Sequence, residues 1–127
     1  HCSGWMTGLI PMYIKSVYKK EPVFSRSKLV FTIGENTFKE KLGTAFLKLS
    51  AISDGITKKE QDLYKDTTNS ALFRVGASFA DAISFGAAKI DKKLTEEFSK
   101  VKGKKVLKYD EGSDLTDYLQ LYTDLAK

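Results

Sequence analysis

The first eleven residues constrain the fold more than any other part of this 127-residue chain. Residues 1–5 are followed by Thr7, Gly8, two apolar residues and Pro11, and then by a helical pattern. This order is typical of a β-strand that ends in a tight turn and leads into a helix, because proline is tolerated in a helix's first turn. In open α/β sheets ligands bind outside the carboxyl ends of the strands. We therefore expect His1 and Trp5 to lie at such an end, and the strand that delivers His1 to begin upstream of residue 1.

The rest of the chain alternates between helical and strand-like segments. The apolar periodicity predicts helices over 7–20, 58–65, 68–80 and 90–100, with a last helix capped by Ser113. Strands are predicted over 27–34, 82–85 and 104–109, whereas residues 46–49 fit either a short helix or a loop. Residues 28–33 are β-branched and aromatic on both faces, which is typical of a strand in a parallel sheet. We predict one three-layer, Rossmann-like α/β domain over residues 1–127, with a mostly parallel sheet.

The last predicted helix carries an apolar stripe, which we expect to lie in the core rather than to form a groove for a partner. Its members are Leu115, Tyr118, Leu119, Tyr122 and Leu125.

Composition argues against several classes of protein. The net charge is +5, but the lysines occur in scattered pairs interrupted by acids, which indicates a solvated surface rather than a nucleic-acid footprint. No stretch approaches the roughly 20 apolar residues of a membrane span, so we expect no membrane partner. The single Cys2 excludes an internal disulfide and favours a cytoplasmic location.

Motifs for chemistry are few. The sequence has no Walker loop, no G-x-G-x-x-G and no C-x-x-C, so we expect neither a metal nor a cofactor, and we identify no catalytic residue. His1 and Cys2 are neighbours on a strand and should point to opposite faces, which argues against a thiol–imidazole pair. Thr57 and Glu60 have the spacing of a helix capping box, which explains this glutamate without a catalytic role.

His1, Trp5 and the loop Gly34-Glu35-Asn36 remain as the candidate site. For His1 and Trp5, ligand contact and a purely structural role in the core both stay open.

Four segments resemble bacterial glycogen and starch synthases. Residues 1–13 resemble their H-x-H-D-W-H-x-x-L-x-P-x-Y segment, and residues 18–33 are similar to the stretch that leads into their V-F-T-I-H-N strand. Residues 72–83 resemble a family helix that ends in A-D-x-V/I. The tail, residues 117–125, looks like the end of diverged, single-lobe synthase-like proteins of Bacteroides-type bacteria.

The resemblance implies a fold and a reaction. Family members have two Rossmann-like lobes, the glycosyltransferase-B arrangement, and transfer glucose from ADP-glucose to an α-1,4-glucan without a metal. This chain resembles the second half of the first lobe, so we expect residues 1–127 to be a C-terminal fragment of that lobe. By position, His1 and Trp5 carry over as substrate-binding residues.

Several family positions depart from the pattern. The His after the Trp is Met6, the His-Asp before it is Ser3-Gly4, and the His-Asn after the strand is Gly34-Glu35. Methionine cannot donate the hydrogen bonds that histidine donates.

Three functions therefore stay open. The first is a glucosyltransferase lobe, with a partner supplying the second lobe. The second is a catalytically inactive relative that binds glucan or a sugar nucleotide, or that regulates a true synthase. The third is a basic module that binds a nucleotide or nucleic acid.

Overall fold

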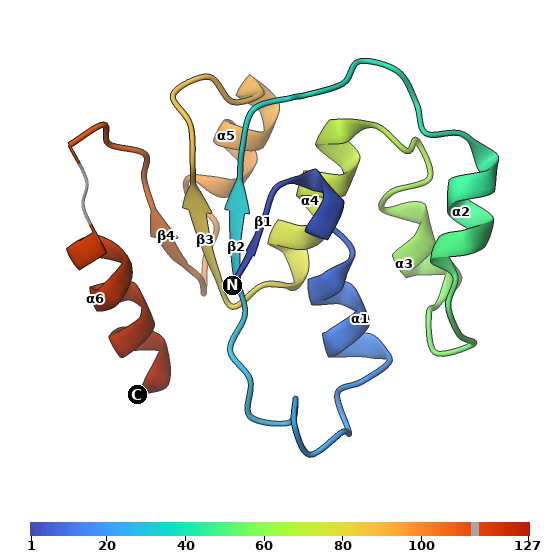
Figure 1. Cartoon of the computed structure of the whole chain (residues 1–127), viewed down its shortest axis with the longest axis horizontal. Coiled ribbons are helices and arrows are strands. Elements are labelled where there is room, and N and C mark those ends of the chain that lie inside the picture. The colour runs from blue at the N-terminus through green and yellow to red at the C-terminus, as the bar shows by residue number, and fades with distance from the viewer. Residues whose placement is uncertain (113–114) are drawn as a thin grey trace.

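The computed structural model describes residues 1–112 and 115–127, and it contains a four-stranded sheet in which all strands are parallel (Figure 1). The strands are β1 (Cys2–Ser3), β2 (Val30–Ile33), β3 (Ala82–Phe85) and β4 (Lys105–Leu107), and they lie side by side in chain order. The predicted parallel α/β fold is confirmed. The predicted N-cap at Ser113 lies outside the described residues.

Helices fill the connections between the strands, and one more helix follows the last strand. They are the 3₁₀ helix η1 (Trp5–Thr7), α1 (Ile10–Ser16), α2 (Thr44–Ser50), α3 (Lys58–Asp62), α4 (Asn69–Phe79), α5 (Lys92–Phe98) and α6 (Leu115–Ala126). The first predicted helix is shorter than expected, because Trp5–Thr7 forms a separate 3₁₀ turn and α1 ends four residues early. Residues 46–49, which fitted either a short helix or a loop, lie in helix α2. The predicted Thr57–Glu60 capping box is present.

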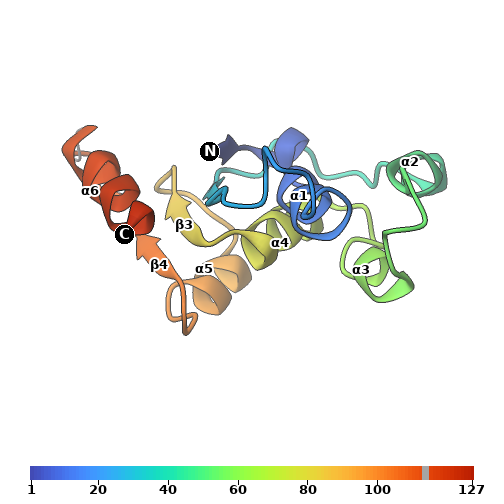
Figure 2. The same cartoon turned by 90° about the horizontal axis from the view of Figure 1, so that it is seen from below.

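The sheet lies between two layers of helices, as Figure 2 shows. One face packs on α4 and α5 through a core that includes Phe31, Ile83 and Leu94. On the opposite face α6 buries Leu121 against Val30 and Ala82. This arrangement confirms the predicted three layers. A second core beside the sheet joins α1 and α4 to the segments on either side of α3, which contribute Ile56 and the fully buried Tyr64.

The predicted core stripe of α6 is wrong in most of its members. Leu115 is 85% exposed and Leu119 is 65% exposed, whereas Leu121, which lies outside the stripe, is the buried residue of the helix. Leu125 alone of the stripe packs against the sheet-side cluster. The helix therefore meets the sheet through Leu121 and Leu125 and leaves the leucines of its first half uncovered.

Every helix in the described part of the chain is too short or too polar to cross a bilayer.

Candidate functional site

The carboxyl ends of the parallel strands define one edge of the sheet, and Trp5 lies at this edge. It follows β1 directly, through a glycine, Gly4, whose φ of 82° is in the left-handed region that favours glycine. The turn is closed by Thr7, whose Oγ1 lies 3.0 Å from the carbonyl oxygens of both Ser3 and Gly4. The sequence-based placement of Trp5 at a carboxyl end is therefore correct.

The Trp5 indole is half-buried and packs edge-on against Phe38, with ring centroids 4.8 Å apart. It lines a groove of about 280 Å³ between η1, α1, α2 and α4. Tyr13, Phe46 and Leu49 form much of the remaining wall. We call this the Trp5 groove. The far wall of this groove could not be predicted from the sequence, because the pattern of residues 46–49 fits either a helix or a loop.

The polar groups around the Trp5 groove are already hydrogen-bonded to the protein. Tyr13 Oη donates to the carbonyl oxygen of Ser50 at 2.8 Å, and Ser50 Oγ lies 3.1 Å from Tyr64 Oη. Burial, with smaller contributions from Tyr64 and Tyr18, raises the pKa of Tyr13 to about 12. The Tyr13 hydroxyl therefore stays protonated at neutral pH and is not a base.

The exposed end of the groove carries Met6, which is 79% exposed. Its thioether is at most a weak hydrogen-bond acceptor. Glu35 and Asn36 are also exposed and follow β2 at the same edge of the sheet, as predicted. This edge thus offers an indole, a carboxylate and an amide.

His1 does not lie at the carboxyl edge, and the prediction that placed it there is wrong. Cys2 lies opposite Phe31 in the sheet register, so His1 precedes β1 and lies beside the middle of the sheet. Its Nε2 is 2.7 Å from Thr32 Oγ1, which is in turn 2.5 Å from Ser84 Oγ. The prediction for His1 fails because the strand includes Cys2 and Ser3, so only residues after Ser3 reach the carboxyl end of β1.

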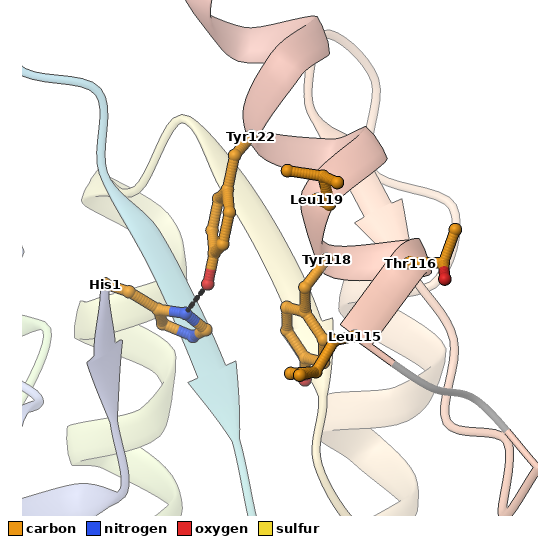
Figure 3. Close-up of a pocket in the computed structure, with 6 residues that line it drawn as sticks. All are labelled: His1, Leu115, Thr116, Tyr118, Leu119 and Tyr122. Atoms are coloured by element: carbon orange, nitrogen blue, oxygen red, sulfur yellow. Dashed lines mark hydrogen bonds between the residues drawn. The ribbon is translucent and has the colours of Figure 1, made fainter.

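The other nitrogen of the His1 ring faces α6 (Figure 3). Nδ1 is 2.6 Å from Tyr122 Oη, and the imidazole also lies 5.7 Å from the ring centroid of Tyr118. Together with exposed leucines of α6 they line a pocket of about 520 Å³. The structure therefore separates His1 from Trp5: one belongs to the sheet face below α6, the other to the Trp5 groove.

Nucleophilic or metal chemistry has little basis in the described residues. They contain no group of three or more His, Cys, Asp or Glu side chains that could hold a metal ion. Cys2 packs on the α4 side of the sheet, the face opposite His1, as predicted. Burial raises the pKa of the Cys2 thiol, so the thiolate is disfavoured.

Comparison with known proteins identifies relatives of this chain. The sequence model described as "Starch synthase catalytic domain" matches residues 1–109. A glycogen synthase of Photobacterium profundum is 30% identical over 84 residues, which are 66% of this chain and 16% of that protein. A glycogen synthase of Thermotoga petrophila is 29% identical over 85 residues, 66% of this chain and 17% of the relative. The chain thus spans about a sixth of the length of these curated relatives.

A shorter match is more similar in sequence. A glycogen synthase of Desulforudis audaxviator is 48% identical over 33 residues, which are 26% of this chain and 7% of the relative. No solved structure matches the chain significantly. The family match ends at residue 109, so the resemblance of the tail to single-lobe proteins stays a prediction.

Proposed function

Since the chain belongs to the starch synthase catalytic domain family, we propose that it is the glucan-binding part of a glycogen synthase-like glycosyltransferase, and that Trp5 contacts the sugar. The observation that carries this proposal is the position of the indole. It lies at the carboxyl edge of a parallel sheet and lines the Trp5 groove. The flat face of a pyranose ring presents C–H groups that pack well on an aromatic ring.

We also propose that glucose transfer needs groups from outside this chain. Transfer from a sugar nucleotide such as ADP-glucose passes through a positively charged sugar, and placed polar groups lower the barrier. At the proposed sugar contact this chain offers the exposed Met6, and the hydroxyl of Tyr13 is already bonded to Ser50. Glu35 and Asn36 lie at the same edge of the sheet but do not line the Trp5 groove. A second lobe, or a true synthase, would supply the missing donors. In this proposal His1 has a structural role, because its two ring nitrogens are engaged by Thr32 and Tyr122.

Two surfaces support the proposal that residues 1–127 are one part of a larger lobe. Among the residues described, β1 pairs only with β2, so its other edge offers unpaired backbone groups. Part of the apolar stripe of α6 is also uncovered, with Leu115 and Leu119 mostly exposed.

Any sequence that precedes His1 in a longer form of the protein should contain the family's Lys-x-Gly-Gly-Leu loop. A different sequence there would contradict this proposal. The cytoplasmic location stays a prediction.

Fluorescence offers a direct test, because Trp5 is the single tryptophan of the chain. Titration with maltoheptaose, an α-1,4-glucan, should give a saturable change in Trp5 emission. Dextran, whose main chain is α-1,6-linked, is the control and should give a much smaller change. Equal responses to both sugars, or none to maltoheptaose, would contradict a glucan contact at Trp5.

Glycogen co-sedimentation provides the variant test. Trp5→Ala should lose most of its binding to glycogen, whereas Tyr18→Ala should keep it, because Tyr18 is a 40% exposed aromatic residue that does not line the groove. Unchanged sedimentation of Trp5→Ala would remove Trp5 as a sugar contact.

Incorporation of glucose from ADP-glucose into glycogen tests whether the chain is catalytically active by itself. Turnover by the isolated chain would contradict the proposal that groups from outside the chain are needed.

A further inference from the structure

A separate pocket of about 490 Å³ lies at the carboxyl ends of β3 and β4, away from the Trp5 groove. Its lining includes Phe85, the last residue of β3, and Lys108 and Tyr109, which follow β4 directly. Because these strands are parallel neighbours, with Ser84 opposite Leu107, their carboxyl ends bring the residues together. Ser99, just after α5, completes one side of the pocket. The volume is within the range of small-molecule sites.

The inner part of this pocket is apolar and fixed in place. Phe85 is 7% exposed, and Ile90 packs partly buried against the main core. The loop between them begins at Gly86, whose N–H donates to the carbonyl oxygen of Ile33 at 2.8 Å. A Cβ on this glycine would lie 2.6 Å from Thr32 Cγ2, so the loop can approach β2 this closely only with glycine. The small side chain of Ala87 leaves the space beside Phe85 open.

The outer part of the pocket carries unused polar groups. Within the described residues, Lys108 Nζ, Tyr109 Oη and Ser99 Oγ have no hydrogen bond or ion pair, in contrast to the groups around the Trp5 groove. Each acid that neighbours a lining residue in the sequence has a partner within the chain, and Glu96, next to Thr95, lies 4.0 Å from Lys92 Nζ. Asp91 accepts hydrogen bonds from Ser70 and from backbone N–H groups of α5, and Asp110 accepts one from Gly112 N.

The complementary ligand is defined by four features of the pocket: its apolar floor, the 41% exposed ring of Tyr109, the ammonium group of Lys108 and the hydroxyl of Ser99. We propose that this pocket binds a flat ring that carries an anionic group, the chemistry of a nucleoside monophosphate. The ring would lie between Phe85 and Tyr109, and the phosphate would face Lys108 and Ser99. The site is independent of the glucan contact proposed at Trp5, since the two pockets share no residue.

Calorimetric titration of the chain with adenosine 5′-monophosphate, adenosine and inorganic phosphate tests the proposal. The monophosphate should bind saturably, and adenosine should bind about fivefold more weakly, since an exposed ion pair contributes up to about 1 kcal/mol. Phosphate alone should bind weakest, because it leaves the apolar floor uncovered. Lys108→Met should reduce the affinity for the monophosphate to that for adenosine, and Tyr109→Ala should reduce both.

Lys102→Met is the matched control. It removes the same charge at the opposite end of β4, and it should leave the affinity unchanged. Circular dichroism of each variant checks that it is folded. Absence of saturable heat with the monophosphate would overturn the proposal, as would an equal loss in Lys102→Met and Lys108→Met, which would indicate attraction by net charge alone. Trp5→Ala should bind the monophosphate normally, so failure of this site and failure of the glucan contact are distinguishable.

Discussion

Replacing Gly76 by alanine tests the closest approach of a helix to the sheet. Gly76 lies within α4 and faces Phe31 of β2, which is fully buried. A Cβ at this position would lie 2.7 Å from Phe31 Cε1 and closer still to Cε2 and Cζ. The ring cannot turn aside freely, because it packs edge-on against Phe73, with ring centroids 6.3 Å apart. Either the helix must move outward or the ring must leave its preferred rotamer.

Two opposing effects set the size of the change. Alanine favours an α-helix over glycine by about 1 kcal/mol, whereas overpacking a core costs about 1–3 kcal/mol. Since the contact is with several ring atoms, we expect the upper part of that range and a net loss of about 1–2 kcal/mol in the free energy of unfolding. Urea denaturation followed by circular dichroism measures this difference.

A control and a compensating variant make the experiment specific. Gly112→Ala should change stability by less than about 0.5 kcal/mol, because its Cβ would meet only Asp110 Oδ1, at 3.6 Å. Phe31→Leu combined with Gly76→Ala should show a favourable coupling of about 1 kcal/mol, since the shorter side chain makes room for the methyl group. A Gly76→Ala variant more stable than the wild type would refute the close packing of α4 on β2.

Three further predictions concern a helix cap, a partly buried hydroxyl and the uncovered face of α6. Burial opposes ionisation of Asp91, but hydrogen bonds from Ser70 and the α5 backbone outweigh it and lower the pKa of this carboxyl. Asp91→Ala should therefore cost about 1 kcal/mol at neutral pH. Urea titrations should find this cost shrinking as the pH falls through the lowered pKa. The folded chain keeps the Tyr13 proton up to a pKa of about 12, whereas the unfolded chain loses it near 10, so stability should fall between these pH values, and Tyr13→Phe should remove that part of the fall in alkaline denaturation. Leu119→Ser should lower the binding of a hydrophobic dye and any self-association seen by light scattering, without loss of stability, because this leucine is 65% exposed.

The parallel sheet could be predicted because its central strands are buried on both faces. Residues 82–85 were predicted and found with the same limits, and all four are buried. Thr57 and Glu60 fixed the start of α3 for a local reason, since the two side chains bond each other's backbone N–H groups. The sequence is therefore sufficient to predict an element whose signal is local or whose residues are all buried.

The orientation of α6 could not be predicted for the opposite reason. This helix has apolar residues on more than one face, so periodicity alone does not say which face meets the sheet. The contact is decided by distant residues: Leu121 fits against Val30 and Ala82, and Lys105 Nζ pairs with Asp124 at 2.6 Å. These partners come from three different strands, and no local pattern connects them with the helix.

The separation of His1 from Trp5 shows how register decides a site. Both residues belong to one short segment, and a pattern that identifies a strand followed by a turn does not say where the strand begins. Because Cys2 and Ser3 pair with Phe31 and Thr32, the strand ends at Ser3, and Trp5 alone passes the carboxyl edge. The imidazole is left to connect β2 with α6 through Thr32 and Tyr122. Ligand contact at this edge therefore rests on the indole, whereas a change at His1 should act on the attachment of α6 and leave the Trp5 groove intact.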